Sequence, residues 1–384
     1  MKNKVFIGIL LTSLMLTIIG CSSKNNNSSS NSNSVSTMST KLLSSDVFTD
    51  RDLEQTVDTS DATTYQVSDG KDISITKEGV YVITGSAKNV SIVVNVDSEE
   101  KVGLVLSDLT IENESNPCIY VKNADKVFVT TVGTNKLTVT GTFTSDEENN
   151  TDAVIFSKDD LVVNGTGLLT ITSTNNGITS KDDLKITGGT INITCSSDAL
   201  EANNAIAIAD GNITINSKKD GLHSEYSDDE SVGYIYISGG NLNITANDDA
   251  IHATTIIQID GGEIKTNSHE GMEGTFIQIN DGTIDIKASD DAINAGAKSD
   301  LYTPTIEING GIINIDMGGG DTDAIDSNGN LYINGGTINI TAQSPFDYDG
   351  EGKLNGGEVT VNGNVVTELS SQMMGGPMGQ RSGR

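Results

Sequence analysis

Isoleucine and polar residues alternate in short runs along most of this chain, and the runs recur at a near-regular interval. Thr190–Thr194 reads Thr-Ile-Asn-Ile-Thr, and Thr337–Thr341 repeats the same five residues. A period of two places the isoleucines on one face of a β-strand and the polar side chains on the other. Each run therefore predicts a strand with one buried and one solvent-facing side.

Glycine-containing turns separate the runs and set the length of the repeat. Each turn is followed by a strand, a short acidic corner and a second strand such as Tyr234–Ile237, and successive turns lie 20 to 29 residues apart. A repeat of this length indicates a solenoid, in which each coil buries its apolar face on its neighbours. We expect an all-β chain folded as a right-handed parallel β-helix, with about 20–22 residues per coil plus loop insertions. The turns begin at Gly188, Asp210, Gly239, Gly261, Asp281, Gly310, Gly335 and Gly356.

The two ends of the chain differ from the repeats. Residues 1–20 carry two lysines and an apolar run that leads into Cys21, which is typical of a lipoprotein signal peptide. The run is shorter than the roughly 20 residues that span a bilayer. We expect removal of 1–20, lipidation of Cys21, a Ser/Asn-rich tether over 21–45, the β-helix over 46–366 and a disordered Gly/Met-rich tail over 367–384. A cleaved signal with an incidental Cys21 is the alternative.

Composition narrows the choice of partners. The formal net charge of −30 argues against nucleic acid and anionic headgroups as direct partners and favours cations. A polyanion would need metal ions as the bridge. The chain has no Trp, which weakens the case for a flat aromatic platform for neutral sugars. Apart from Cys21, only Cys118 and Cys195 remain, several coils apart, and we expect both to be buried free thiols.

An acidic, a small and an aliphatic residue follow one another at each corner, as in Asp249-Ala250-Ile251. Stacked carboxylates about 4.8 Å apart would repel by about 3.5 kcal/mol at an effective dielectric of 20. A calcium ion, which binds oxygen at about 2.3–2.6 Å, fits between them. In the alternative, each acid only makes a turn with its own backbone. The candidate calcium ligands are Asp198, Asp220, Asp248, Asp249, Glu270, Asp290, Asp291, Asp321 and Asp323.

A row of polar residues follows the corners, and two insertions, 224–233 and 296–304, interrupt the coils beside it. We expect the insertions to frame a patch containing Asp249, His252, Glu270 and Glu273, which is the candidate ligand site. Histidine suits a softer metal than calcium, but its interleaving with Glu and Asn predicts an exposed polar face. The row comprises Glu201, His223, His252, Glu273, Asn294 and Asp326, and the candidate ligand-binding residues are Glu201, Tyr236, His252, Lys265 and Glu273.

Six short motifs lie along the chain, at 48–54, 119–128, 156–161, 181–189, 233–240 and 346–350. The first reads Phe-Thr-Asp-Arg-Asp-Leu-Glu and the last Phe-Asp-Tyr-Asp-Gly. Together they resemble a family of secreted bacterial proteins described as carbohydrate-binding domain-containing, over about 46–366. The resemblance implies a right-handed parallel β-helix similar to pectate lyases, with calcium sites, that binds plant cell-wall or acidic polysaccharide. It assigns no ligand residue beyond the corner acids.

These observations predict a monomeric cell-surface lipoprotein that binds a pectin-like acidic polysaccharide through calcium on the acidic row, touching the membrane only through its lipid. Two alternatives stay open. One is a calcium-dependent polysaccharide lyase, for which Lys265 and Lys287 are candidate bases because no arginine lies on the repeats. The other is a structural stalk or adhesin that binds no sugar. No residue is assigned to catalysis.

Overall fold

The computed structural model describes residues 45–145, 150–318 and 322–370, which belong to one compact unit, 39–384. Almost all of its regular structure is β-strand, preceded by a single 3-10 turn, η1 (Ser45–Val47). Among these residues no helix is long and apolar enough to cross a membrane. Asp321, Cys21, the signal peptide and most of the tether and tail lie outside the described residues.

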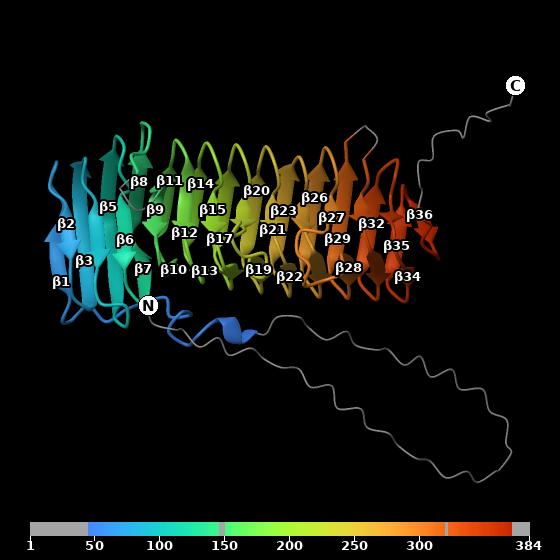
Figure 1. The fold of residues 1–384 in the computed structure, drawn as a ribbon, viewed down its shortest axis with the longest axis horizontal. Coiled ribbons are helices and arrows are strands. Elements are labelled where there is room, and N and C mark those ends of the chain that lie inside the picture. The colour runs from blue at the N-terminus through green and yellow to red at the C-terminus, as the bar shows by residue number, and fades with distance from the viewer. Residues whose placement is uncertain (1–44, 146–149, 319–321, 371–384) are drawn as a thin grey trace, which may run out of the picture. The chain divides into compact units, whose positions relative to one another are not determined.

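The strands stack as the successive coils of a parallel β-helix (Figure 1). Each coil contributes one strand to each of three faces, and strands on the same face pair in parallel with the coils before and after. Connections between parallel strands are right-handed in nearly all proteins. The short-strand face consists of β2 (Ile73–Ile75), β4 (Ile92–Asn95), β6 (Ile119–Asn123), β9 (Ala153–Ser157), β12 (Asn176–Ser180), β15 (Leu200–Ala202), β18 (Leu222–Ser224), β21 (Ile251–Ala253), β24 (Met272–Gly274), β27 (Ile293–Ala295), β30 (Ile325–Ser327) and β33 (Asp347–Tyr348).

The other two faces belong to one hydrogen-bonded sheet, because the long strands β3 (Gly79–Lys88) and β5 (Lys101–Asn113) run through both. The second face adds β1 (Thr63–Gln66), β7 (Lys126–Val132), β10 (Asp160–Gly165), β13 (Asp183–Ile186), β16 (Ala205–Ile208), β19 (Tyr234–Ile237), β22 (Ile256–Ile259), β25 (Phe276–Ile279), β28 (Thr305–Ile308), β31 (Asn330–Ile333) and β34 (Gly352–Leu354). The third face adds β8 (Thr134–Val139), β11 (Leu168–Thr172), β14 (Thr190–Thr194), β17 (Asn212–Asn216), β20 (Asn241–Thr245), β23 (Glu263–Ser268), β26 (Thr283–Ala288), β29 (Ile312–Met317), β32 (Thr337–Thr341), β35 (Glu358–Val361) and the antiparallel β36 (Asn364–Val366).

Ladders of aliphatic side chains fill the interior, as the alternating pattern predicts. On the third face Leu242 pairs in register with Ile264, and Ile264 with Ile284, and all three side chains are fully buried. Burial of one such side chain contributes about 1.5–3 kcal/mol. The turns stack as well: Gly240 has φ +91°, and a Cβ there would lie 3.1 Å from the carbonyl oxygen of Gly211, so the position requires glycine.

The acidic corner leads directly into a third strand, which the two-strand coil predicted from the sequence lacked. In one coil the corner Asp220-Gly221 is followed by β18, whose Leu222 points into the core. The strands of this face have only two to five residues, too few to show an alternating pattern. The residues of the polar row therefore lie on the outward side of a sheet, where strand pairing holds their side chains in register.

An N-terminal strap, defined here as residues 48–57, lies against the outer side of the second face. Gln55 donates from Nε2 to the carbonyl oxygen of Thr187 at 2.8 Å. The ring of Phe48 lies 6.0 Å from that of Tyr236, which is 1% exposed and donates its hydroxyl to Asp260. The strap therefore covers Tyr236, which the sequence predicts to bind ligand.

Cys118 and Cys195 are both free and buried, which confirms their predicted state. Burial raises the pKa of each thiol to about 12. Both side chains belong to the aliphatic core.

Candidate functional site

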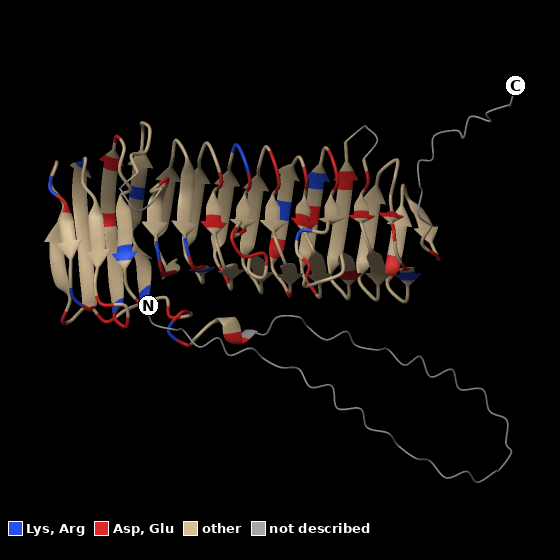
Figure 2. Cartoon of the chain, in the orientation of Figure 1, with Lys and Arg blue, Asp and Glu red and all other residues tan. Residues whose placement is uncertain are grey.

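Acidic residues recur from coil to coil along the β-helix, and basic residues are sparser (Figure 2). On the short-strand face, the register pairs Glu201 with His223, His223 with His252 and His252 with Glu273. The row continues through Asn294 and Asp326. The polar row predicted from the sequence is thus confirmed as one continuous line of neighbouring side chains. Its predicted exposure is wrong for His252, which is buried.

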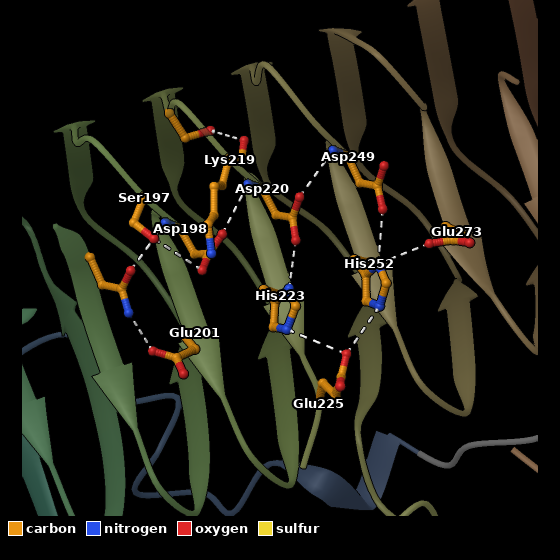
Figure 3. Close-up of polar contacts among 12 residues, drawn as sticks. Ser197, Asp198, Glu201, Lys219, Asp220, His223, Glu225, Asp249, His252 and Glu273 are labelled. Carbon is orange, nitrogen blue, oxygen red and sulfur yellow. Dashed lines mark hydrogen bonds and ion pairs between the residues drawn. The ribbon is translucent and has the colours of Figure 1, made fainter. Parts of the chain in front are cut away.

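The two histidines stack at the centre of this row (Figure 3). Their ring centroids lie 4.9 Å apart and the ring planes differ by 9°. The Nδ1 atom of His223 lies 2.5 Å from Asp220 Oδ2, and that of His252 lies 2.8 Å from Asp249 Oδ2. Each aspartate precedes its histidine by three residues, so the repeated spacing Asp-x-x-His is the sequence pattern that marks this arrangement.

The charges around His252 are strongly coupled. Burial alone would lower the pKa of His252, but its contacts with Asp249 and Glu273 raise that pKa to about 10. Burial would raise the pKa of Glu273, and His252 together with Lys298 instead lowers it to about 2. The Nζ atom of Lys298 lies 2.6 Å from Glu273 Oε1. The centre of the row is therefore a network of paired charges.

Several corner aspartates hydrogen-bond the next coil, which neither sequence-based alternative described. Asp198 Oδ1 accepts the backbone N–H of Asp220, and Asp220 Oδ1 accepts that of Asp249, both at 3.0 Å. Asp291 does the same for Asp323. These carboxylates therefore tie successive coils together instead of only closing turns with their own backbone.

Glu270 is bound differently from the corner aspartates. Burial, followed by the charge of Asp249, raises its pKa to about 8. Its Oε2 accepts from Asn294 Nδ2 at 3.1 Å. Ligand atoms of His269, Glu270 and Asp290 lie within 4.8 Å of one another. Those of Asp220, Asp248 and Asp249 form a second such group. Five of the predicted calcium ligands thus belong to one or other of these two clusters: Asp220, Asp248, Asp249, Glu270 and Asp290.

The two insertions meet above the row. Ser299 Oγ in the second insertion donates to the carbonyl oxygen of Glu230 in the first at 2.7 Å. The backbone N–H groups of Lys298 and Ser299 both donate to Thr275 Oγ1. Between the insertions lies a pocket with a volume of about 200 Å³. It is lined by Glu225, Tyr226, Ser227, Glu230, Thr254 and Lys298.

The remaining predicted ligand residues lie apart from this pocket. Glu201, two coils from His252 along the row, pairs with Lys181 at 3.1 Å and accepts from Thr179. Lys265, also predicted to bind ligand, lies on β23 of the third face, exposed and paired with Glu263, and so on a different face from His252. Sequence reasoning identified the insertions but missed Tyr226 and Lys298 within them, because an isolated residue in a loop breaks no repeat.

Known proteins resemble the chain in sequence and in fold. A family model for a carbohydrate-binding domain-containing protein matches residues 69–319 and 264–365. The chain belongs to this family. A carbohydrate-binding domain-containing protein of Acetivibrio thermocellus is 41% identical over 202 residues, covering 51% of the chain and 71% of that relative. The carbohydrate-binding family and its lyase-like fold thus agree with the resemblance seen in the motifs.

One solved structure shares the fold of this carbohydrate-binding family member. It is that of a polysaccharide lyase-like protein from C. thermocellum, in a gadolinium derivative. The two match with a TM-score of 0.52 and 30% identity, over 55% of this chain and 92% of the other. Together with the family match, this similarity supports glycan binding as the general function.

Proposed function

We propose that the chain binds an acidic, pectin-like polysaccharide in the pocket between the two insertions, with calcium held by the neighbouring corner acids. The observation that carries the proposal is the set of side chains lining the pocket. Lys298 offers an ammonium group for a sugar carboxylate, Glu225 and Glu230 accept from hydroxyl groups, and the partly exposed ring of Tyr226 offers an apolar face. Such a mixture of polar and aromatic groups is typical of a ligand pocket.

Calcium would offset the negative charge that an acidic glycan meets on this protein. Asp220, Asp248 and Asp249 offer oxygen atoms within 4.8 Å of one another, the donor type that calcium prefers. Glu270, whose pKa is raised to about 8 by burial and by Asp249, marks a place where carboxylates crowd. A bound calcium ion supplies positive charge that can bridge to sugar carboxylates.

Replacing Lys298 by Ala is expected to weaken binding of polygalacturonate in calcium by about 10- to 100-fold, because a hydrogen bond to a charged group contributes about 1.5–3 kcal/mol. Tyr226→Ala should weaken binding in the same assay through loss of the aromatic contact. Isothermal titration calorimetry on the purified protein measures both. The matched control is Lys287→Ala, which removes an exposed lysine from the third face.

Equal affinity of the parent and the Lys298→Ala variant would contradict the proposed pocket. Absence of polygalacturonate binding by the parent, in calcium and in chelator, would favour the structural stalk. A rise in ultraviolet absorbance from an unsaturated product during the titration would favour the lyase instead.

We also propose that the protein is attached to the outer face of the cell membrane through a lipid on Cys21, because the residues before it have the composition of a lipoprotein signal. Metabolic labelling with a fatty acid should mark the parent protein in the membrane fraction. A Cys21→Ser variant should lose the label and leave the membrane or remain unprocessed. Unchanged labelling of the variant would disprove the anchor.

A further inference from the structure

The outer nitrogen atoms of the two stacked histidines face the same carboxylate. His252 Nε2 lies 3.5 Å from Glu225 Oε2, and His223 Nε2 lies 3.7 Å from the same oxygen (Figure 3). Glu225 belongs to the first insertion and also lines the pocket. Three side chains from two coils and one insertion thus converge on one point beside an open space.

The inner nitrogen atoms of the same rings are held by carboxylates. Asp220 and Asp249 contact the Nδ1 atoms of His223 and His252 respectively. With Nδ1 donating to a carboxylate, Nε2 is the atom that can bind a metal ion, which there replaces the second proton of the charged imidazole. Metal-binding histidines nearly always have such a second partner, which fixes the tautomer and the orientation of the ring.

The His252 side chain gives a second, independent indication of a ligand. Only 10% of this side chain is exposed, yet its Nε2 atom has no hydrogen-bond partner among the described residues. A buried polar atom without a hydrogen-bond partner destabilises the fold, so a ligand that binds it is favoured. This atom points toward Glu225, at the place where the His223 nitrogen also points (Figure 3).

From this geometry we propose that His223 Nε2, His252 Nε2 and the Glu225 carboxylate bind one transition-metal dication of the zinc class, separately from the calcium proposed for the corner acids. Two nitrogen ligands select such a metal, because calcium prefers oxygen and imidazole suits zinc. Three protein ligands leave a fourth position open, as in zinc sites that also bind a water or a substrate group.

A shared ion requires a small rearrangement of the histidine pair. Two nitrogen atoms bound to one tetrahedral zinc at about 2.0–2.1 Å lie about 3.3 Å apart. The two rings are nearly parallel with centroids 4.9 Å apart, so binding of one ion requires their Nε2 ends to turn toward each other. The carboxylates of Asp220, Asp249 and Glu273 lie around the pair and favour an added positive charge. Glu225 is 43% exposed at its side chain, so an ion can enter from the pocket.

Calorimetric titration of the chelator-treated, untagged protein with zinc chloride alone tests the proposal without any glycan. We expect one zinc ion per chain. His223→Gln and His252→Gln should each weaken zinc binding by more than about 100-fold, and Asp249→Asn by about 10- to 100-fold. Cobalt substitution should give visible absorption bands in the parent that both histidine variants lose. Asp316→Asn, which removes an exposed carboxylate from the third face, is the control.

Glu225→Gln is a variant that should fold normally, because the residue lies on an exposed insertion. It should weaken zinc binding. Its melting temperature without metal should equal that of the parent. Zinc binding of equal strength in the parent and the His252→Gln variant would overturn the proposal, as would no zinc binding by the parent. Either result would mean that the histidines serve only as partners of the surrounding acids. Since calcium and polysaccharide are absent, failure here leaves the proposed glycan binding untouched.

Discussion

An Asp52→Asn variant is expected to weaken attachment of the N-terminal strap to the β-helix by about 3 to 5 kcal/mol, the usual cost of removing one partner from a buried ion pair. The Asp52 side chain is fully buried and lies 3.3 Å from Lys126 Nζ and 3.4 Å from Lys185 Nζ. Both lysines are themselves about nine-tenths buried. Without the carboxylate, Lys126 would keep its ion pair with Asp160 at 3.5 Å, and Lys185 would lose its ion pair with the strap in a poorly solvated place.

The lowered pKa of Asp52 also indicates that its ion pairs with the two lysines stabilise the folded strap. Burial alone would raise this pKa, but the N–H of Thr49 and the charges of Lys126 and Lys185 lower it overall. A carboxyl group with a lowered pKa stabilises the folded state above its unfolded value of 3.8 and loses that effect as the pH falls through the lowered value. The ion pair therefore stabilises the strap at neutral pH.

Hydrogen exchange followed by mass spectrometry measures the effect on the strap itself. Amides of residues 48–57 should exchange much faster in the Asp52→Asn variant, and Tyr236 should become accessible, while the coils far from the strap stay protected. Glu54→Gln removes an exposed carboxylate from the same segment and is the matched control. Exchange in the strap that is the same for Asp52→Asn and the parent would show that the ion pair does not hold it.

Removal of calcium is expected to lower the melting temperature of the parent protein. Binding to the folded state alone stabilises by about 2.7 kcal/mol at a hundredfold excess of calcium over Kd. An Asp249→Asn, Glu270→Gln double variant should lose much of this stabilisation, because it keeps the size of both side chains but removes their charges. In chelator the double variant should be at least as stable as the parent, since the repulsion between the two carboxylates is gone.

The pH dependence of the melting temperature is a separate test of the crowding of the Asp249 and Glu270 carboxyl groups. Glu270 and Asp249 have pKa values raised to about 8 and about 6, burial being the first cause for both, so the folded state holds protons that the unfolded state releases. His252, with a pKa raised to about 10, stabilises fully below 6.5 and loses that effect as the pH rises through 10. In chelator the melting temperature should therefore fall as the pH rises from about 5 to about 9. Calcium should reduce the fall.

Differential scanning calorimetry with calcium and with chelator measures both the effect of the double variant and the effect of pH on the melting temperature. Asp316→Asn, which removes an exposed carboxylate from the third face, is the control for a general charge effect. If the parent melts at one temperature in calcium and in chelator, and titration detects no bound ion, then the corner acids serve only to connect coils. The hydrogen bonds that the backbone N–H of Asp220 donates to Asp198, and that of Asp249 donates to Asp220, would then explain the row of corner acids.

The repeat by itself determined the parallel β-helix, the stacking of its isoleucines and the continuous polar row. These features follow from local patterns: alternation decides which side chains face inward, and a glycine turn in each coil puts equivalent residues in register. Leu242 above Ile264 and His223 beside His252 could therefore be predicted without knowing where any distant residue lies.

Only the tertiary structure decided what covers those faces and what completes the pocket. Asp52 meets Lys185 from 133 positions away, and Ser299 meets Glu230 from 69 positions away. No periodic pattern contains these contacts, because the strap and the insertions lie outside the repeat and their positions depend on shape and charge across several coils. For this reason Tyr236 proved to be buried, Lys265 proved to be remote, and Lys298 and Glu225 became visible as site residues only in three dimensions.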